Sequence, residues 1–131
     1  MTALDHARTA YARPQSPGRS PRTLEYDLLA RVTRRMEASW SRHKKDFPGL
    51  AAALDENARL WTTFAADVAA PGNALPAPLR AQIFYLFQFT QAHTRRVLAG
   101  AASVEALVEI NLSVMRGLRG ETGRVDGGAA E

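Results

Sequence analysis

Histidines are the first residues in this sequence that could do chemistry, because an imidazole can transfer a proton or bind a metal ion near neutral pH. The chain has three, His6, His43 and His93, which are far apart in sequence and lie outside any metal-binding or catalytic motif. His93 falls on the edge of a predicted helix face, where packing is a more common role than metal ligation. We therefore expect no metal site at these positions.

Motifs for other kinds of catalysis are missing as well. The sequence contains no cysteine, which excludes thiol nucleophiles, thiolate zinc sites and disulfides. It also contains no glycine-rich phosphate loop, no HExxH motif and no GxSxG motif. These absences predict a protein that is not an enzyme and that needs no cofactor.

The size and charge of the chain favour one small domain. Its 131 residues suffice for a packed core, and 46% of them are hydrophobic. The formal net charge of +4 attracts anionic surfaces in general. Residues 1–5 do not resemble a secretory signal, and the longest dense apolar stretch, 83–89, is far shorter than the roughly 20 residues of a membrane-spanning helix. We expect a cytoplasmic protein.

Clusters of proline and glycine divide the sequence into intervals in which apolar residues repeat with a helical period. The predicted long helices cover about 21–43, 49–69, 76–99 and 103–118. No segment shows the alternation typical of a strand. The sequence thus predicts an all-α fold, an antiparallel helical bundle of about four main helices plus a short N-terminal helical segment over 1–13. In domain terms, 1–20 is an arm and loop, 21–119 the bundle, and 120–131 a flexible glycine-rich tail.

Two asparagines lie inside apolar seams of the predicted bundle. Asn57 is in the second long helix and Asn111 in the fourth. A buried amide without a hydrogen-bond partner costs on the order of 1–3 kcal/mol. Two interpretations stay open: the asparagines fix the helix register by bonding the backbone or each other, or they bind a partner.

The third long helix is apolar on more than one side. Its predicted core stripe consists of Ile83, Leu86, Phe87, Thr90 and Val97. Tyr85 and Phe89 project from nearly the opposite side, where Arg96 continues the line. This second stripe either binds a partner helix or is covered by the N-terminal segment, for example through Tyr11.

Basic residues gather along the first long helix and the turn after it: Arg31, Arg34, Arg35, Arg42, Lys44 and Lys45. Such an edge could contact RNA phosphates. No aromatic residue is interleaved to stack on bases, so a solvated helix face is the favoured interpretation.

Four short motifs follow one another at compatible spacings. They are PRTLEY at 21–26, NARLW at 57–61, NALPAPLRA at 73–81, and Ile110-Asn111 with MRGL at 115–118. Together they resemble the FlaF family of flagellar biosynthesis regulators of alphaproteobacteria. The resemblance spans about 21–118 and leaves the loop at 14–21 and the tail after Gly120 outside.

The resemblance implies a small cytoplasmic helical protein that is needed for flagellin production and filament assembly. Such a protein would act with the translational regulator FlbT and bind flagellin as a secretion chaperone. The alternatives are direct action on flagellin mRNA, a plain adaptor to FlbT, and a homodimer formed through the exposed aromatic pair. The residues predicted to contact a partner are Tyr85, Phe89, Arg96, Asn57, Trp61, Asn73, Arg80 and Asn111.

Overall fold

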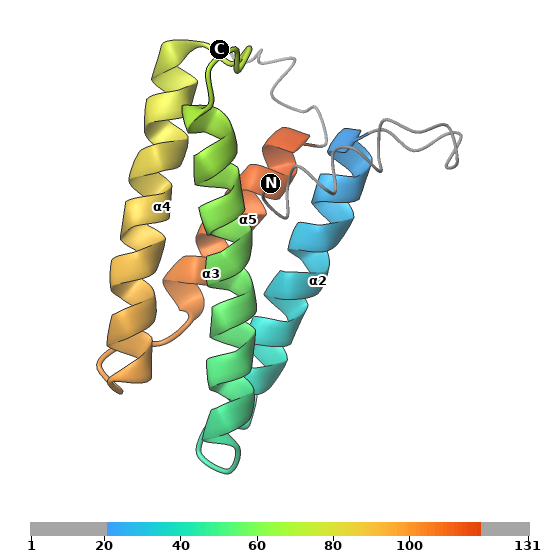
Figure 1. The fold of residues 1–131 in the computed structure, drawn as a ribbon. Coiled ribbons are helices and arrows are strands. Elements are labelled where there is room, and N and C mark those ends of the chain that lie inside the picture. Colours follow the sequence, from blue (N-terminus) through green and yellow to red (C-terminus); the bar gives the residue numbers. More distant parts are fainter. Residues whose placement is uncertain (1–20, 119–131) are drawn as a thin grey trace, which may run out of the picture.

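The computed structural model describes residues 21–118, and within them the fold is entirely helical. The helices are α2 (Pro21–Ser41), α3 (Phe47–Ala69), α4 (Ala77–Leu98) and α5 (Glu105–Leu118). They run alternately up and down, joined by short turns (Figure 1). The predicted all-α bundle of four main helices is confirmed. The predicted helical segment over 1–13 and the predicted tail lie outside the described residues.

The start of α3 differs from the sequence prediction. Pro48 and Gly49 were expected to interrupt the chain before the helix, but α3 already begins at Phe47, and Pro48 lies in its first turn. Proline is tolerated there because the first backbone N–H groups of a helix have no intrahelical acceptor. Asp46 caps the helix, since its Oδ1 accepts a hydrogen bond of 3.0 Å from the backbone N–H of Gly49.

The turns around α4 follow the sequence closely. The side chain of Asn73 accepts a hydrogen bond of 3.0 Å from the backbone N–H of Leu75, a local turn that asparagine favours. Pro76 directly precedes the first residue of α4. After Leu98 the chain leaves the helix, and Gly100 takes a φ of +78°, a conformation that favours glycine.

The core is built mainly from α2, α3 and α5, with α4 added at one side. Helix α2 packs against both α3 and α5, whereas α4 packs against α3 and, less extensively, against α5. Helices α2 and α4 lie on one diagonal of the bundle and α3 and α5 on the other, so the backbones within each pair are not in close contact. Figure 1 shows α5, in orange to red, starting beside the end of α4 and running toward the beginning of α2.

This course of α5 corrects the predicted core stripe of α4. In the carboxyl-terminal half of the helix, Thr90 and Val97 are buried as expected. In the amino-terminal half, Ile83, Leu86 and Phe87 are only half-buried. The reason is that α5 diverges from α4 toward α2, so the amino-terminal half of α4 has only α3 as a neighbour among the described helices.

Candidate functional site

The two seam asparagines belong to one buried hydrogen-bond network. The side-chain Nδ2 of Asn111 donates to Oδ1 of Asn57 at 2.9 Å and to Oγ1 of Thr33 at 3.0 Å. Nε1 of Trp61 donates to Oδ1 of Asn111 at 2.9 Å. The network ties α2, α3 and α5 together, so the interpretation in which the asparagines bond each other is confirmed.

The side chains of Asn57, Trp61 and Asn111 are too deeply buried to contact a partner. Their exposed fractions are 0%, 1% and 1%. A partner cannot contact these side chains while the bundle stays closed, so we attribute to them a role inside the fold. Contact with a partner stays a prediction for the other five residues. The Nδ2 of Asn57 is buried and has no hydrogen-bond acceptor among the described residues.

Asn73 and Arg80 hold the turn between α3 and α4. Nδ2 of Asn73 donates to the backbone oxygen of Asp67 at 3.2 Å, and Nε of Arg80 donates to the backbone oxygen of Leu75 at 3.0 Å. Both residues are half-buried. These bonds fix where α4 begins, and they thereby orient the aromatic residues that follow.

Four exposed apolar residues of α4 lie between its first turn and its middle, and a fifth, Leu98, is the last residue of the helix. Tyr85 is 64% exposed and Phe89 is 37% exposed, in line with the expected outward stripe. Leu79 and Phe84, which the sequence reasoning did not single out, are 45% and 41% exposed. We call these four residues the α4 apolar surface. Leu79 was missed because it falls on the helix side that also holds Thr90, and a helical pattern does not show where the neighbouring helix ends.

Phe89, the residue of the α4 apolar surface nearest the end of α4, contacts the rest of the bundle through His93. The ring of Phe89 stacks on that of His93, with centroids 5.4 Å apart and an interplanar angle of 19°. Nε2 of His93 bonds the backbone oxygen of Ser103 at 2.9 Å, which agrees with the packing role expected for this histidine. Nη2 of Arg96 donates to the backbone oxygen of Ala101 at 3.3 Å. Phe89 and Arg96 thus lie beside the α4–α5 turn.

The basic edge lies on the other side of the molecule, on α2 and the turn after it. Arg35 forms an ion pair of 3.0 Å with Glu56 of α3. The remaining members are exposed and form no ion pair with a described residue: Arg31, Arg34, Arg42, Lys44 and Lys45. This arrangement suits a solvated face, and it leaves these cations available to an anionic ligand.

Two negative findings apply to residues 21–118. No group of three histidine, aspartate or glutamate side chains lies close enough there to hold a metal ion. In the same part of the chain no helix combines the length and the apolar character needed to cross a membrane.

Comparison with known proteins gives one match. The family model described as "Flagellar protein FlaF" matches residues 7–118, which covers most of the chain. It is a family of flagellar proteins and not an enzyme family. The match includes the loop at 14–21, which the four motifs had left outside, and it ends before the glycine-rich tail. No curated protein and no solved structure matches the chain.

Proposed function

Since this chain belongs to the FlaF family of flagellar proteins, we propose that it binds newly made flagellin and couples flagellin synthesis and export to filament assembly. In this role it acts as a secretion chaperone in the cytoplasm. It keeps an aggregation-prone helical segment of its client covered until export. FlbT is the second partner that we propose, as a regulator acting on the same pathway.

The observation that supports this proposal is the α4 apolar surface. Exposed apolar residues that are contiguous and large are characteristic of binding sites, because leaving them in water is unfavourable. Next to them lie the half-buried side chains of Ile83, Leu86 and Phe87. A partner helix laid along Tyr85 and Phe89 would cover the outward stripe of α4.

The geometry favours a helix over an extended peptide as the bound segment. All described elements are helices, so no sheet edge exists there to which a strand could be added. Tyr85 and Phe89 are four residues apart and therefore lie one above the other along α4. An amphipathic helix of flagellin, with apolar residues at the same spacing, is the segment that fits this surface.

Calorimetric titration with the cognate flagellin tests the proposal. We expect saturable binding with a negative heat-capacity change, the mark of an apolar interface. The double variant Phe84→Ser/Tyr85→Ser should weaken binding at least about tenfold, as the loss of central aromatic anchors does in other interfaces. Phe47→Ser is the matched control, because Phe47 is 47% exposed but lies at the start of α3. Equal affinities for both variants would contradict the assignment to α4.

The alternative function is direct action on flagellin mRNA through the basic edge. The observation that favours it is that five cations of this edge form no ion pair with a described residue. Binding to the mRNA leader would then weaken steeply with salt, with a log–log slope of about −0.7 for each phosphate neutralised. Arg31→Gln/Arg34→Gln should lower RNA affinity and flatten that slope while flagellin binding stays unchanged. An adaptor role would instead show as FlbT binding that the Phe84→Ser/Tyr85→Ser variant loses.

A further inference from the structure

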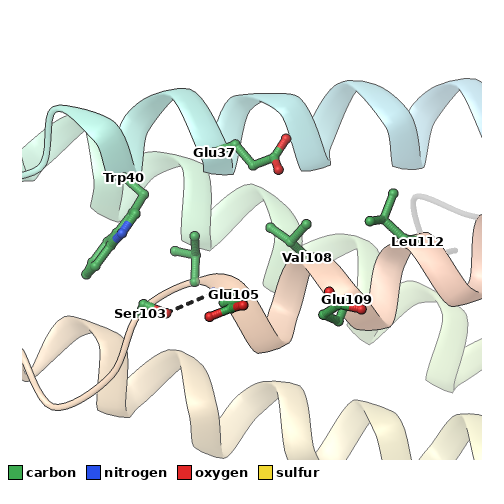
Figure 2. Close-up of a pocket in the computed structure, with 8 residues that line it drawn as sticks. Glu37, Trp40, Ser103, Glu105, Val108, Glu109 and Leu112 are labelled. Carbon is green, nitrogen blue, oxygen red and sulfur yellow. Dashed lines mark hydrogen bonds between the residues drawn. The ribbon is translucent and has the colours of Figure 1, made fainter.

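A groove of about 390 Å³ lies between the end of α2 and the first half of α5 (Figure 2). Its volume is at the lower end of the range for ligand clefts, which is roughly 300–1,000 Å³. The residues that carry the argument are Trp40, Val108 and Leu112, which are apolar, and Glu37, Glu105 and Glu109, which are acidic.

The apolar residues of this groove are held in place by the core. Val108 is buried, Trp40 is half-buried and packs against the core cluster, and Leu112 is 36% exposed. His43 stacks on the indole of Trp40, with centroids 3.8 Å apart and an interplanar angle of 4°. The imidazole thereby covers one face of the indole and limits how far the ring can turn.

The three carboxylates have no cationic partner among residues 21–118. Glu37 comes from α2, while Glu105 and Glu109 come from α5, and in Figure 2 Val108 lies between Glu37 and Glu109. No lysine, arginine or histidine nitrogen of the described residues lies within 4.0 Å of any of them. Elsewhere, Glu56 is paired with Arg35 and Asp55 with Arg59. The groove is thus a local concentration of unpaired negative charge on a chain with a net charge of +4.

The three carboxylates are too far apart to bind one metal ion together. No set of three acidic or histidine side chains in residues 21–118 lies close enough to hold a metal ion. Glu37, Glu105 and Glu109 therefore do not form such a set. A long cationic side chain has no such requirement, because it can lie between separated carboxylates and bond to each through different N–H groups.

We propose that this groove binds a segment of a partner protein that carries arginine or lysine next to apolar residues. The apolar side chains pack on Trp40, Val108 and Leu112, and the cation lies among the three carboxylates. The groove is lined by residues of α2, of α5 and of the turn before α5, and none of its lining residues belongs to α4. The chain therefore has two separate docking surfaces, and the inference about the groove does not depend on flagellin binding at α4.

The test is titration of the full chain, ¹⁵N-labelled, with three blocked synthetic peptides that form one-sided leucine helices. Their polar face carries arginine, lysine or glutamine. The readout is the NMR signal of the two indole N–H groups. Trp40 lines the groove, while Trp61 is buried and bonded to Asn111, so Trp61 serves as an internal reference.

We expect the arginine and lysine peptides to bind saturably, to shift the Trp40 signal and to leave that of Trp61 in place. The glutamine peptide should bind at least about tenfold more weakly. Glu109→Gln should weaken binding of the arginine peptide about two- to fivefold, the range for loss of one exposed ion pair. Asp55→Asn is the matched control, because it removes one negative charge of α3 outside the groove lining, and it should have no effect.

Three results would overturn the inference. They are equal binding of the glutamine and arginine peptides, equal effects of Glu109→Gln and Asp55→Asn, and no saturable shift of Trp40. Flagellin titrations of the same variants separate the two proposals. A groove that fails this test leaves binding at α4 intact, and loss of flagellin binding in Phe84→Ser/Tyr85→Ser leaves the groove result unchanged.

Discussion

The side-chain amides of Asn57 and Asn111 meet in the centre of the bundle, with the Nδ2 of Asn111 2.9 Å from the Oδ1 of Asn57. They come from α3 and α5, and they are separated by 54 positions in the sequence. Each amide would be costly in an apolar core on its own. Because they bond each other, Trp61 and Thr33, they stabilise one alignment of three helices. Other alignments would leave the buried amides without partners.

Removing Asn111 should destabilise the bundle strongly. Asn111→Ala leaves the indole N–H of Trp61, the hydroxyl of Thr33 and the amide oxygen of Asn57 without their bonds. We expect the free energy of unfolding to fall by about 2–4 kcal/mol, measured by urea denaturation followed by circular dichroism. Ser113→Ala, at an exposed position of the same helix, is the control and should change stability by less than about 0.5 kcal/mol. A loss that small for Asn111→Ala would show that the network contributes little.

Removing a second buried polar group, the hydroxyl of Thr90, should not destabilise the bundle. The hydroxyl of Thr90 is buried, and its Oγ1 has no hydrogen-bond partner among the described residues. Thr90→Val replaces this hydroxyl by a methyl group of similar shape and removes an unsatisfied polar atom. The free energy of unfolding should stay unchanged or rise by up to about 1 kcal/mol. A decrease of more than about 1 kcal/mol in the same denaturation experiment would argue that the hydroxyl is bonded in solution.

Substitutions of Asp46 and Gly49, at the start of α3, should have non-additive effects on the free energy of unfolding. A Cβ added at Gly49 would lie 2.5 Å from Oδ2 of Asp46, so the carboxylate must turn away and release its cap bond. Gly49→Ala should therefore be less favourable in the native background than in Asp46→Ala, where only the helix preference for alanine remains. We expect a coupling free energy of about 0.5–2 kcal/mol in a double-mutant cycle. Additive effects within error would mean that the carboxylate does not cap the helix.

His93 should carry its proton on one defined nitrogen. The backbone oxygen of Ser103 is an acceptor 2.9 Å from Nε2, so the neutral imidazole has to donate through Nε2–H. Long-range ¹H–¹⁵N NMR spectra of the neutral imidazole should show a protonated Nε2 and an unprotonated Nδ1. His43 gives an internal contrast, because its Nδ1 is the nitrogen that faces a backbone oxygen, that of Trp40 at 2.7 Å. The same tautomer at both histidines would contradict these assignments.

Local signals predicted the helices well, because their ends depend on residues near in sequence. Asn73 and Pro76 place the start of α4, and Gly100 marks its end, as their backbone preferences require. Asn57 and Asn111 were recognisable as polar residues in apolar seams. Their pairing with each other was one of two open interpretations, and the structure was needed to decide between them.

The exposed surface could be predicted only in part, because it depends on where distant helices lie. The helical period correctly placed Tyr85 and Phe89 outside the core. It also placed Ile83 and Phe87 inside, and it gave no sign that α5 turns away from them. The groove at Trp40 was not predicted for the same reason, since it joins the end of α2 to α5 across more than half of the chain.

The contact between α2 and α5 has a consequence for how the chain folds as it is synthesised. Helix α5 is the last of the described helices, and Asn111 bonds Thr33, 78 positions earlier. The α2–α3 and α3–α4 hairpins can close early, because their partners are near in sequence, whereas the side of α2 that packs on α5 must wait until α5 has left the ribosome. A nascent chain shorter than about 111 residues therefore holds the amide of Asn57 and the indole of Trp61 without their partner. Helix α5 completes the arrangement of the described helices, and binding surfaces that depend on α5 exist only after α5 has been synthesised.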